Sequence, residues 1–151
     1  MGDYAASGGV YISTPADYIF AHPTTITGSI GVAIAFLTTE DSLEYIGISK
    51  DGVQTSKFAG WTPELPVTEE LDNIFNNLAE RSYQRFLEVV SESRKKDVSE
   101  INKIAGGRVW IGTDALQIDI IDELGDIEDA IGKAASLADI SEYQLKYSSS
   151  D

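Results

Sequence analysis

The stretch Met1-Gly2-Asp3-Tyr4-Ala5-Ala6-Ser7-Gly8-Gly9 gathers small side chains around one serine at the start of the chain. Chain ends usually fray, so such an unusual segment at this place predicts that Met1 is an internal methionine of a longer protein, or that the chain is a fragment. A nucleophilic serine needs room for a substrate backbone, an amide donor for the oxyanion and a nearby base. The small neighbours give Ser7 room, and the Gly8 amide points outward if Ser7 opens a helix. The alternative is a tight helix–strand contact that tolerates only small residues.

Composition bounds the remaining possibilities. The chain has 151 residues, which is one ordinary domain, with 42% hydrophobic and 24% charged residues. Its formal net charge of −14 argues against electrostatic capture of nucleic acid or of an anionic membrane face. Because it contains no cysteine and one histidine, disulfides, thiolate chemistry and histidine-rich metal clusters are excluded. The longest apolar run, Ile30–Leu37, is far shorter than the ~20 residues of a membrane helix.

Several side chains are candidates for the base that a serine nucleophile needs. His22 is the single imidazole, with Asp3 or Asp17 as the third member of a triad, but its place before Pro23 favours a solvated loop histidine. A desolvated lysine is the other possibility. Lys57 lies in a partly apolar, non-helical stretch, although a surface lysine on an edge strand is the simpler interpretation.

Ser29 enters the apolar run directly after Gly28. A buried hydroxyl there needs a partner, and holding an amine would satisfy it; the alternative is an ordinary turn serine bonded to local backbone. The glycines form no nucleotide-binding pattern, so nucleotide binding has no support. No cofactor and no metal site are expected. Four aromatic residues are expected to be core or interface positions: Tyr83, Phe86, Trp61 and Trp110.

Strands alternating with helices predict the α/β class. The clearest element is a long helix over residues 68–96, with apolar residues at helical spacing on one face, acids at its start and bases at its end. Shorter expected elements are a buried strand over 32–37, a helix after Thr38 or Thr39 that ends at Gly47, an extended segment over 52–58, a helix from Asp97 to Gly106-Gly107, a strand over 108–111, a turn of helix capped by Thr113, a helix over 126–138 and an edge strand over 143–147.

Four ordered blocks resemble the signal peptide peptidases of the SppA type. The first is residues 1–12 around Ser7, and the second is Thr25-Ile26-Thr27-Gly28-Ser29-Ile30-Gly31-Val32 at the right distance downstream. The others lie on the long helix and near the carboxyl end: Ser82-Tyr83 with Phe86, Val90 and Arg94, then Gly107-Arg108-Val109-Trp110-Ile111-Gly112 with Ala115 and Asp122-Glu123-Leu124-Gly125. Together they span nearly the whole chain.

The resemblance implies a ClpP/crotonase-like α/β superhelix, incomplete on its amino-terminal side, and peptide-bond cleavage by a Ser-Lys dyad. Ser7 takes the nucleophile position and Gly8 supplies one oxyanion donor through its amide. Ser29 takes the position whose hydroxyl orients the general-base lysine. Residues 1–147 would form the nucleophile-bearing peptidase domain, followed by a loose tail over 148–151.

Two departures from the family pattern shape the expectation. The second oxyanion donor of the family lies upstream of the nucleophile segment, and the base lysine of short members aligns with Ala59 here. The stretch Asp51-Gly52-Val53-Gln54-Thr55-Ser56 is most similar to the carboxyl half of long members, whose amino half supplies the lysine. The chain is therefore expected to be the nucleophile-bearing half of a long-form enzyme and to be nearly inactive alone.

The expected partners are cleaved signal peptides as substrates, together with a missing amino-terminal half or a neighbouring subunit. Homo-oligomers are expected, and nucleic acid is not. The complete protein is expected at a bacterial inner membrane, facing the periplasm, whereas this chain carries no membrane segment and is expected to be soluble. Two alternatives stay open: an inert assembly module of the same fold, and, more weakly, a crotonase-type acyl-CoA enzyme.

Overall fold

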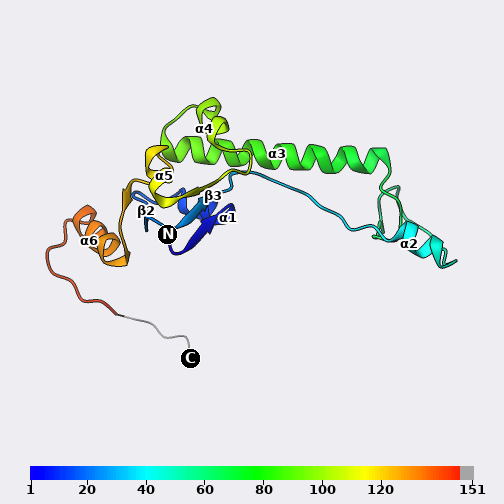
Figure 1. Cartoon of the computed structure of the whole chain (residues 1–151), viewed down its shortest axis with the longest axis horizontal. Helices are drawn as coiled ribbons and strands as arrows, with labels where there is room; N and C mark the ends of the chain where they lie inside the picture. Colours follow the sequence, from blue (N-terminus) through cyan, green and yellow to red (C-terminus); the bar gives the residue numbers. More distant parts are fainter. Residues whose placement is uncertain (147–151) are drawn as a thin grey trace. The chain divides into compact units, whose positions relative to one another are not determined.

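The computed structural model describes residues 1–146 and has a mixed α/β fold (Figure 1), which confirms the predicted class. The chain divides into two compact units. Unit 1 joins Met1–Gly31 to the residues from Phe86 onward, and unit 2 is Val32–Arg85. The long helix α3 (Glu69–Arg94) contributes residues to both units. The expected tail over 148–151 lies outside the described residues.

Unit 1 is built on a small three-stranded sheet with the order β1-β3-β4. Its strands are β1 (Tyr4–Ala6), β3 (Ile26–Gly28) and β4 (Val109–Ile111). β1 and β3 are parallel, whereas β4 runs antiparallel to β3. The fully buried Thr27 in the central strand donates its hydroxyl to the Ala5 carbonyl at 2.9 Å, so this polar side chain is satisfied inside the core. A second pair of short parallel strands consists of β2 (Phe20–Ala21) and β5 (Glu123–Leu124).

Unit 1 also contains short helices (Figure 1). They are α1 (Gly8–Ser13), α4 (Val98–Ile104), α5 (Gly112–Gln117) and α6 (Ile127–Leu137), of which α1 and α5 pack against this sheet. The core of unit 1 is aliphatic, and its least exposed large apolar side chains are Ile30, Leu87, Val90, Ile101 and Ile121. Apolar residues from both the first and the last parts of the chain are therefore needed to complete this core.

The prediction of a long helix over residues 68–96 is confirmed, since α3 covers Glu69–Arg94. Its first turn carries acids and its last turn Arg94, as the helix dipole favours. Its predicted apolar face is buried only towards the ends: Leu71 and Phe86 are buried, but Ile74 and Leu78 are 44% and 55% exposed.

The end of α3 is tied to the rest of unit 1 by Arg94. Its guanidinium holds both carboxylate oxygens of Asp122, at 2.7 and 3.1 Å, and its Nε donates to the Asp119 carbonyl at 2.7 Å. Asp122 also accepts the Ile19 amide at 2.8 Å. Partial burial works to raise the pKa of Asp122, but the hydrogen bonds from Arg94 and Ile19 outweigh it and hold the pKa below its usual value.

Arg94→Met is expected to lower the free energy of unfolding by about 2 kcal/mol at neutral pH, because the half-buried Asp122 carboxylate loses its partner. A carboxylate whose pKa is lower in the folded state stabilises the fold at pH above its unfolded-state pKa, and this stabilisation is lost as the pH falls through the folded-state pKa. The destabilisation caused by Arg94→Met should therefore become smaller below about pH 4. Urea denaturation across pH measures it, and Arg81→Met, at an exposed position of the same helix, should change stability by less than about 0.5 kcal/mol.

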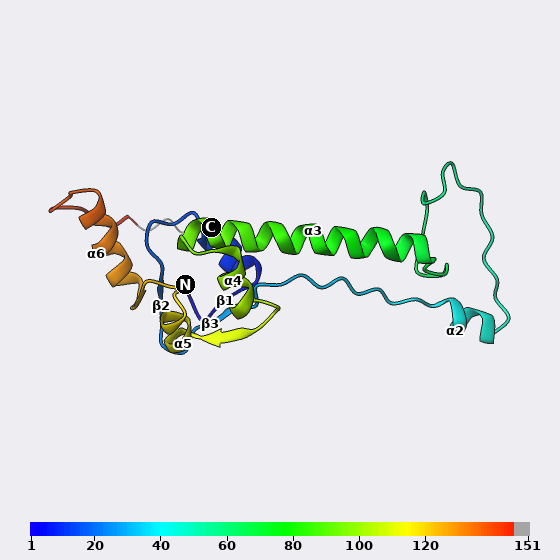
Figure 2. The same ribbon diagram turned by 90° about the horizontal axis from the view of Figure 1, so that it is seen from above.

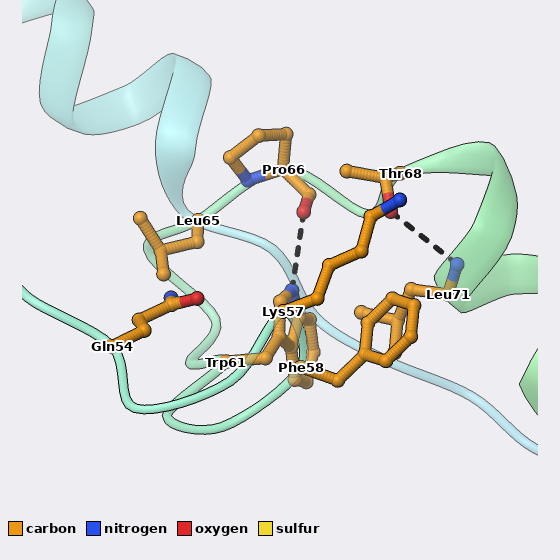
Figure 3. A pocket seen from close by; sticks show the side chains of 8 residues that line it. All are labelled: Gln54, Lys57, Phe58, Trp61, Leu65, Pro66, Thr68 and Leu71. Atoms are coloured by element: carbon orange, nitrogen blue, oxygen red, sulfur yellow. Dashed lines mark hydrogen bonds between the residues drawn. The ribbon is translucent and has the colours of Figure 1, made fainter.

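Unit 2 packs around a few aromatic side chains. The Phe36 ring lies 5.3 Å from Trp61 and 4.2 Å from Phe75, measured between ring centroids. The Trp61 indole nitrogen donates to the Pro66 carbonyl at 3.2 Å, beside a cavity of about 220 Å³ (Figure 3). The side chains that line this cavity are Gln54, Lys57, Phe58, Trp61, Leu65, Pro66, Thr68 and Leu71. The expected short helix is present as α2 (Glu40–Tyr45), with Thr39 before it and Gly47 after it.

The expectation of a buried strand over residues 32–37 is wrong. This segment is extended (Figure 2), but within residues 1–146 no strand pairs with it. Its apolar side chains are exposed, up to 82% at Leu37. The backbone hydrogen bonds that continue the pairing of β3 with β4 extend to Ile30, whose carbonyl accepts the Gly107 amide at 3.0 Å. An apolar run becomes a buried strand only where a neighbouring strand and a packed face exist.

Other local expectations are corrected as well. Residues 52–58 end in a turn instead of an extended segment, and residues 143–146 form no strand, while Tyr147 lies outside the described part. Thr113 lies inside α5, which follows Ile111 as its cap residue. Asp97 precedes α4 but caps it with no side-chain hydrogen bond. Asp126, in contrast, forms a reciprocal capping box with Asp129 at the start of α6, which lies within the predicted range 126–138.

Candidate functional site

Ser7 lies at a sharp turn between a strand and a helix. β1 ends at Ala6 and α1 begins at Gly8, and Ser7 between them has φ 52° and ψ −111°. A positive φ is uncommon for a residue with a side chain and costs free energy, so the surrounding structure must hold it. The Ser7 amide donates to the Gly28 carbonyl at 2.8 Å, and the Ser7 carbonyl accepts the Tyr11 amide at 3.0 Å. Both backbone polar groups of this strained residue are therefore fixed.

The Ser7 side chain is exposed, and its hydroxyl forms no hydrogen bond with any residue in 1–146. The Gly8 amide begins α1, where first-turn amides lack a partner inside the helix. A β-carbon built at Gly8 would meet no atom within 4 Å, so the space beside it is open. The alternative of a closed packing contact at Ser7 disagrees with this exposure.

The structure brings Ser29 next to Ser7 in the sheet. In the parallel register Ala6 is opposite Gly28, so Ser7 and Ser29 each follow a register pair at the carboxyl ends of β1 and β3. Ser29 is half-buried with φ 51°, and its amide donates to the Arg108 carbonyl at 2.6 Å. Two serines with strained backbones thus follow the carboxyl ends of two adjacent strands.

The other candidates lie in ordinary environments. His22 is exposed, and its Nδ1 is 2.9 Å from the hydroxyl of Thr24, which fits the expected loop histidine. Lys57 lies in a turn, is exposed and forms an ion pair with Glu70. Lys50 binds Glu64 at 2.8 Å; this bond, together with one from Thr62, lowers the pKa of Glu64 to about 2. Within residues 1–146, no lysine amine is hydrogen-bonded to Ser7 or Ser29.

Sequence reasoning missed the close packing around Gly28, the residue that accepts the Ser7 amide and precedes Ser29. Gly28 is buried with φ 78°, and a β-carbon there would lie 2.6 Å from Cδ1 of Trp110 and 2.8 Å from the Arg108 carbonyl oxygen. Only glycine fits this position without a shift of its neighbours. The glycine directly before Ser29 was the available signal, but the sequence did not indicate which side chain packs against it.

No helix within residues 1–146 has both the length and the apolar character that crossing a bilayer requires.

The peptidase family S49 model matches residues 1–141. The chain is 44% identical over 147 residues to Protease 4 of Salmonella typhi, which covers 97% of this chain and 24% of that protein. Protease 4 of Haemophilus influenzae is 43% identical over 137 residues, covering 91% of this chain and 22% of that protein. A putative signal peptide peptidase SppA of Enterococcus faecium is 34% identical over 128 residues, 84% of this chain and 37% of that protein.

The chain spans about a quarter of the length of the two Protease 4 relatives. The match to the family model nevertheless runs through nearly the whole chain, from the Ser7 turn past α6. The chain therefore belongs to peptidase family S49, in agreement with its resemblance to SppA-type signal peptide peptidases.

Proposed function

We propose that this chain carries the nucleophile of a serine peptidase that, in the complete protein, degrades remnant signal peptides at a bacterial membrane. The observation that carries the proposal is the strained, exposed Ser7 at the carboxyl end of β1, with Ser29 following the adjacent register pair. The names of the relatives, Protease 4 and signal peptide peptidase SppA, support the reaction and the substrate class.

In the proposed reaction, Ser7 Oγ attacks the carbonyl carbon of a peptide bond while its proton passes to a lysine amine. The Gly8 amide donates to the oxygen that becomes negatively charged, and the protonated amine then gives its proton to the leaving amino group. Water hydrolyses the acyl-enzyme by the reverse sequence of proton transfers. The Ser29 hydroxyl accepts a hydrogen bond from the lysine amine and thereby orients it.

The lysine in this proposal comes from outside residues 1–146, either from another part of the complete protein or from a neighbouring subunit. Lys50, Lys57 and Lys96 are each engaged in an ion pair, with Glu64, Glu70 and Asp119 respectively, and not with either serine. A positioned general base contributes about 10²–10⁴-fold to the rate. The proposed fold is a ClpP/crotonase-like superhelix that the additional segment completes.

Ser7→Ala in the complete protein should abolish labelling by a fluorophosphonate probe, because the probe needs an activated hydroxyl. The measurement is the fraction of protein labelled over time, by mass spectrometry. Ser42→Ala, an exposed serine of α2, is the matched control and should label like the unchanged protein. Residues 1–151 alone should label at least about 100-fold more slowly than the complete protein, for lack of the base.

Equal labelling of the Ser7→Ala variant would refute the assignment of the nucleophile. A complete protein that never labels, although it is folded, would favour the inert assembly module instead.

A further inference from the structure

We propose that Trp110 is a positioning residue for Ser7. Its indole packs between the end of α4 and Gly28, and it thereby fixes the Gly28 carbonyl, which accepts the Ser7 amide. This inference rests on the proposed function, since it concerns the geometry of the same nucleophile. Trp110 packs against Gly28, and the Gly28 carbonyl accepts the Ser7 amide, so Trp110 acts through Gly28.

The first step is the dependence of Ser7 on Gly28. The φ of 52° at Ser7 is a strained conformation, and the Ser7 amide is held by one hydrogen bond, to the Gly28 carbonyl at 2.8 Å. If Gly28 rotated or moved, the Ser7 amide would lose its acceptor and the turn would relax towards a less strained conformation. The direction of the Ser7 hydroxyl and of the Gly8 amide depends on this turn.

The second step is the dependence of Gly28 on Trp110. Gly28 has φ 78° and would be free to move, because glycine has the widest conformational range of any residue. It is confined by Cδ1 of Trp110 and by the Arg108 carbonyl, which come within 2.6 and 2.8 Å of a β-carbon built at Gly28. Arg108 also accepts the Ser29 amide at 2.6 Å. The same short strand segment therefore supports both serines.

The third step is the anchor of Trp110. Its indole nitrogen donates to the Ile104 carbonyl, the last residue of α4, at 3.1 Å. The Arg108 guanidinium donates to the neighbouring carbonyls of Lys103 and Ala105, at 3.1 and 2.8 Å. Side chains from β4 and the residue before it thus satisfy the carbonyls that a helix end leaves open. Ala105 is fully buried, so this anchor belongs to the core of unit 1.

Trp110→Phe keeps a ring against Gly28 but removes the hydrogen bond to Ile104. In the complete protein we expect the rate constant for fluorophosphonate labelling of Ser7 to fall about 10-fold, because misplacement of a reacting group by about 1 Å costs up to 10²-fold. The final labelled fraction should stay the same. Rate and final fraction come from one time course, and together they separate geometry from folding.

The chain offers a matched control. Trp61→Phe removes the same kind of bond, from an indole to the Pro66 carbonyl at 3.2 Å, in unit 2. We expect its labelling rate to match that of the unchanged protein. If Trp110→Phe does not fold, Trp110→Tyr, whose ring carries an additional hydroxyl, serves as the second variant with the same two readouts.

A lower final labelled fraction with an unchanged rate constant would show that Trp110 acts only in folding and would overturn the inference. An equal slowing by Trp61→Phe would overturn it too. The proposed function fails separately, through labelling that persists in Ser7→Ala.

Discussion

Gly28→Ala is expected to lower the free energy of unfolding by about 3 kcal/mol or more, and to leave little labelling of Ser7. The added methyl group would lie 2.6 Å from Cδ1 of Trp110 and 2.8 Å from the Arg108 carbonyl oxygen. The carbonyl belongs to the backbone of the strand segment that also holds Ser29, so the neighbour cannot turn aside as a flexible side chain would. The φ of 78° adds strain for any residue with a β-carbon.

Substitutions at two other glycines separate the steric overlap from the backbone strain. Gly47 has nearly the same φ, 76°, but a β-carbon there meets nothing within 4 Å, so Gly47→Ala should cost about 1 kcal/mol from backbone strain alone. Gly52 has open space and no left-handed φ, and Gly52→Ala should change stability by less than about 0.5 kcal/mol. Urea denaturation followed by tryptophan fluorescence measures all three variants. A cost at Gly28 no larger than that at Gly47 would contradict the close approach of Trp110.

The long helices could be predicted from sequence because their signals are local. The spacing of apolar residues and the charges at both ends locate α3 to within a few residues of its observed ends, Glu69 and Arg94. Gly125 marks the start of α6 in the same way, and the structure adds the capping box of Asp126 there. The run over residues 32–37 has the composition of a buried strand, but strand formation depends on a partner elsewhere, and local sequence does not contain that information. The short strands β2 and β5 were missed for the same reason.

The candidate site likewise combines features that the sequence indicates with one that depends on the pairing of distant strands. The small residues around Ser7 are compatible with room for a substrate and with a tight packing contact, and the structure places this serine in an exposed, strained turn. The resemblance added Ser29, which follows the register pair next to Ser7. The contact between Gly28 and Trp110 joins positions 82 apart in the chain, through the packing of β4 on β3. No periodicity or spacing predicts such a contact, since it depends on the pairing of two strands.

Phe86→Ala is expected to lower the free energy of unfolding by about 3–4 kcal/mol. Phe86 is 4% exposed, and its ring centroid lies 5.1 Å from that of Tyr11 on α1. Truncation removes a large buried apolar surface and leaves a cavity beside the helix that follows Ser7. The measurement is urea denaturation, with Phe86→Leu as a smaller truncation that keeps an apolar side chain and should cost less than Phe86→Ala.

The matched control for this truncation is Tyr45→Ala, an aromatic residue of α2 that is 92% exposed and should change stability by less than about 0.5 kcal/mol. A cost at Phe86 similar to that of the control would mean that the ring is not part of the core. The truncation also separates two supports of α1, because Val10, 3% exposed, remains in place while the contact of Tyr11 with Phe86 is lost. If Val10 alone holds the start of α1, the labelling rate of Ser7 in the folded fraction should stay unchanged. If Tyr11 is needed as well, that rate should fall together with stability, since the Tyr11 amide is the donor that fixes the Ser7 carbonyl.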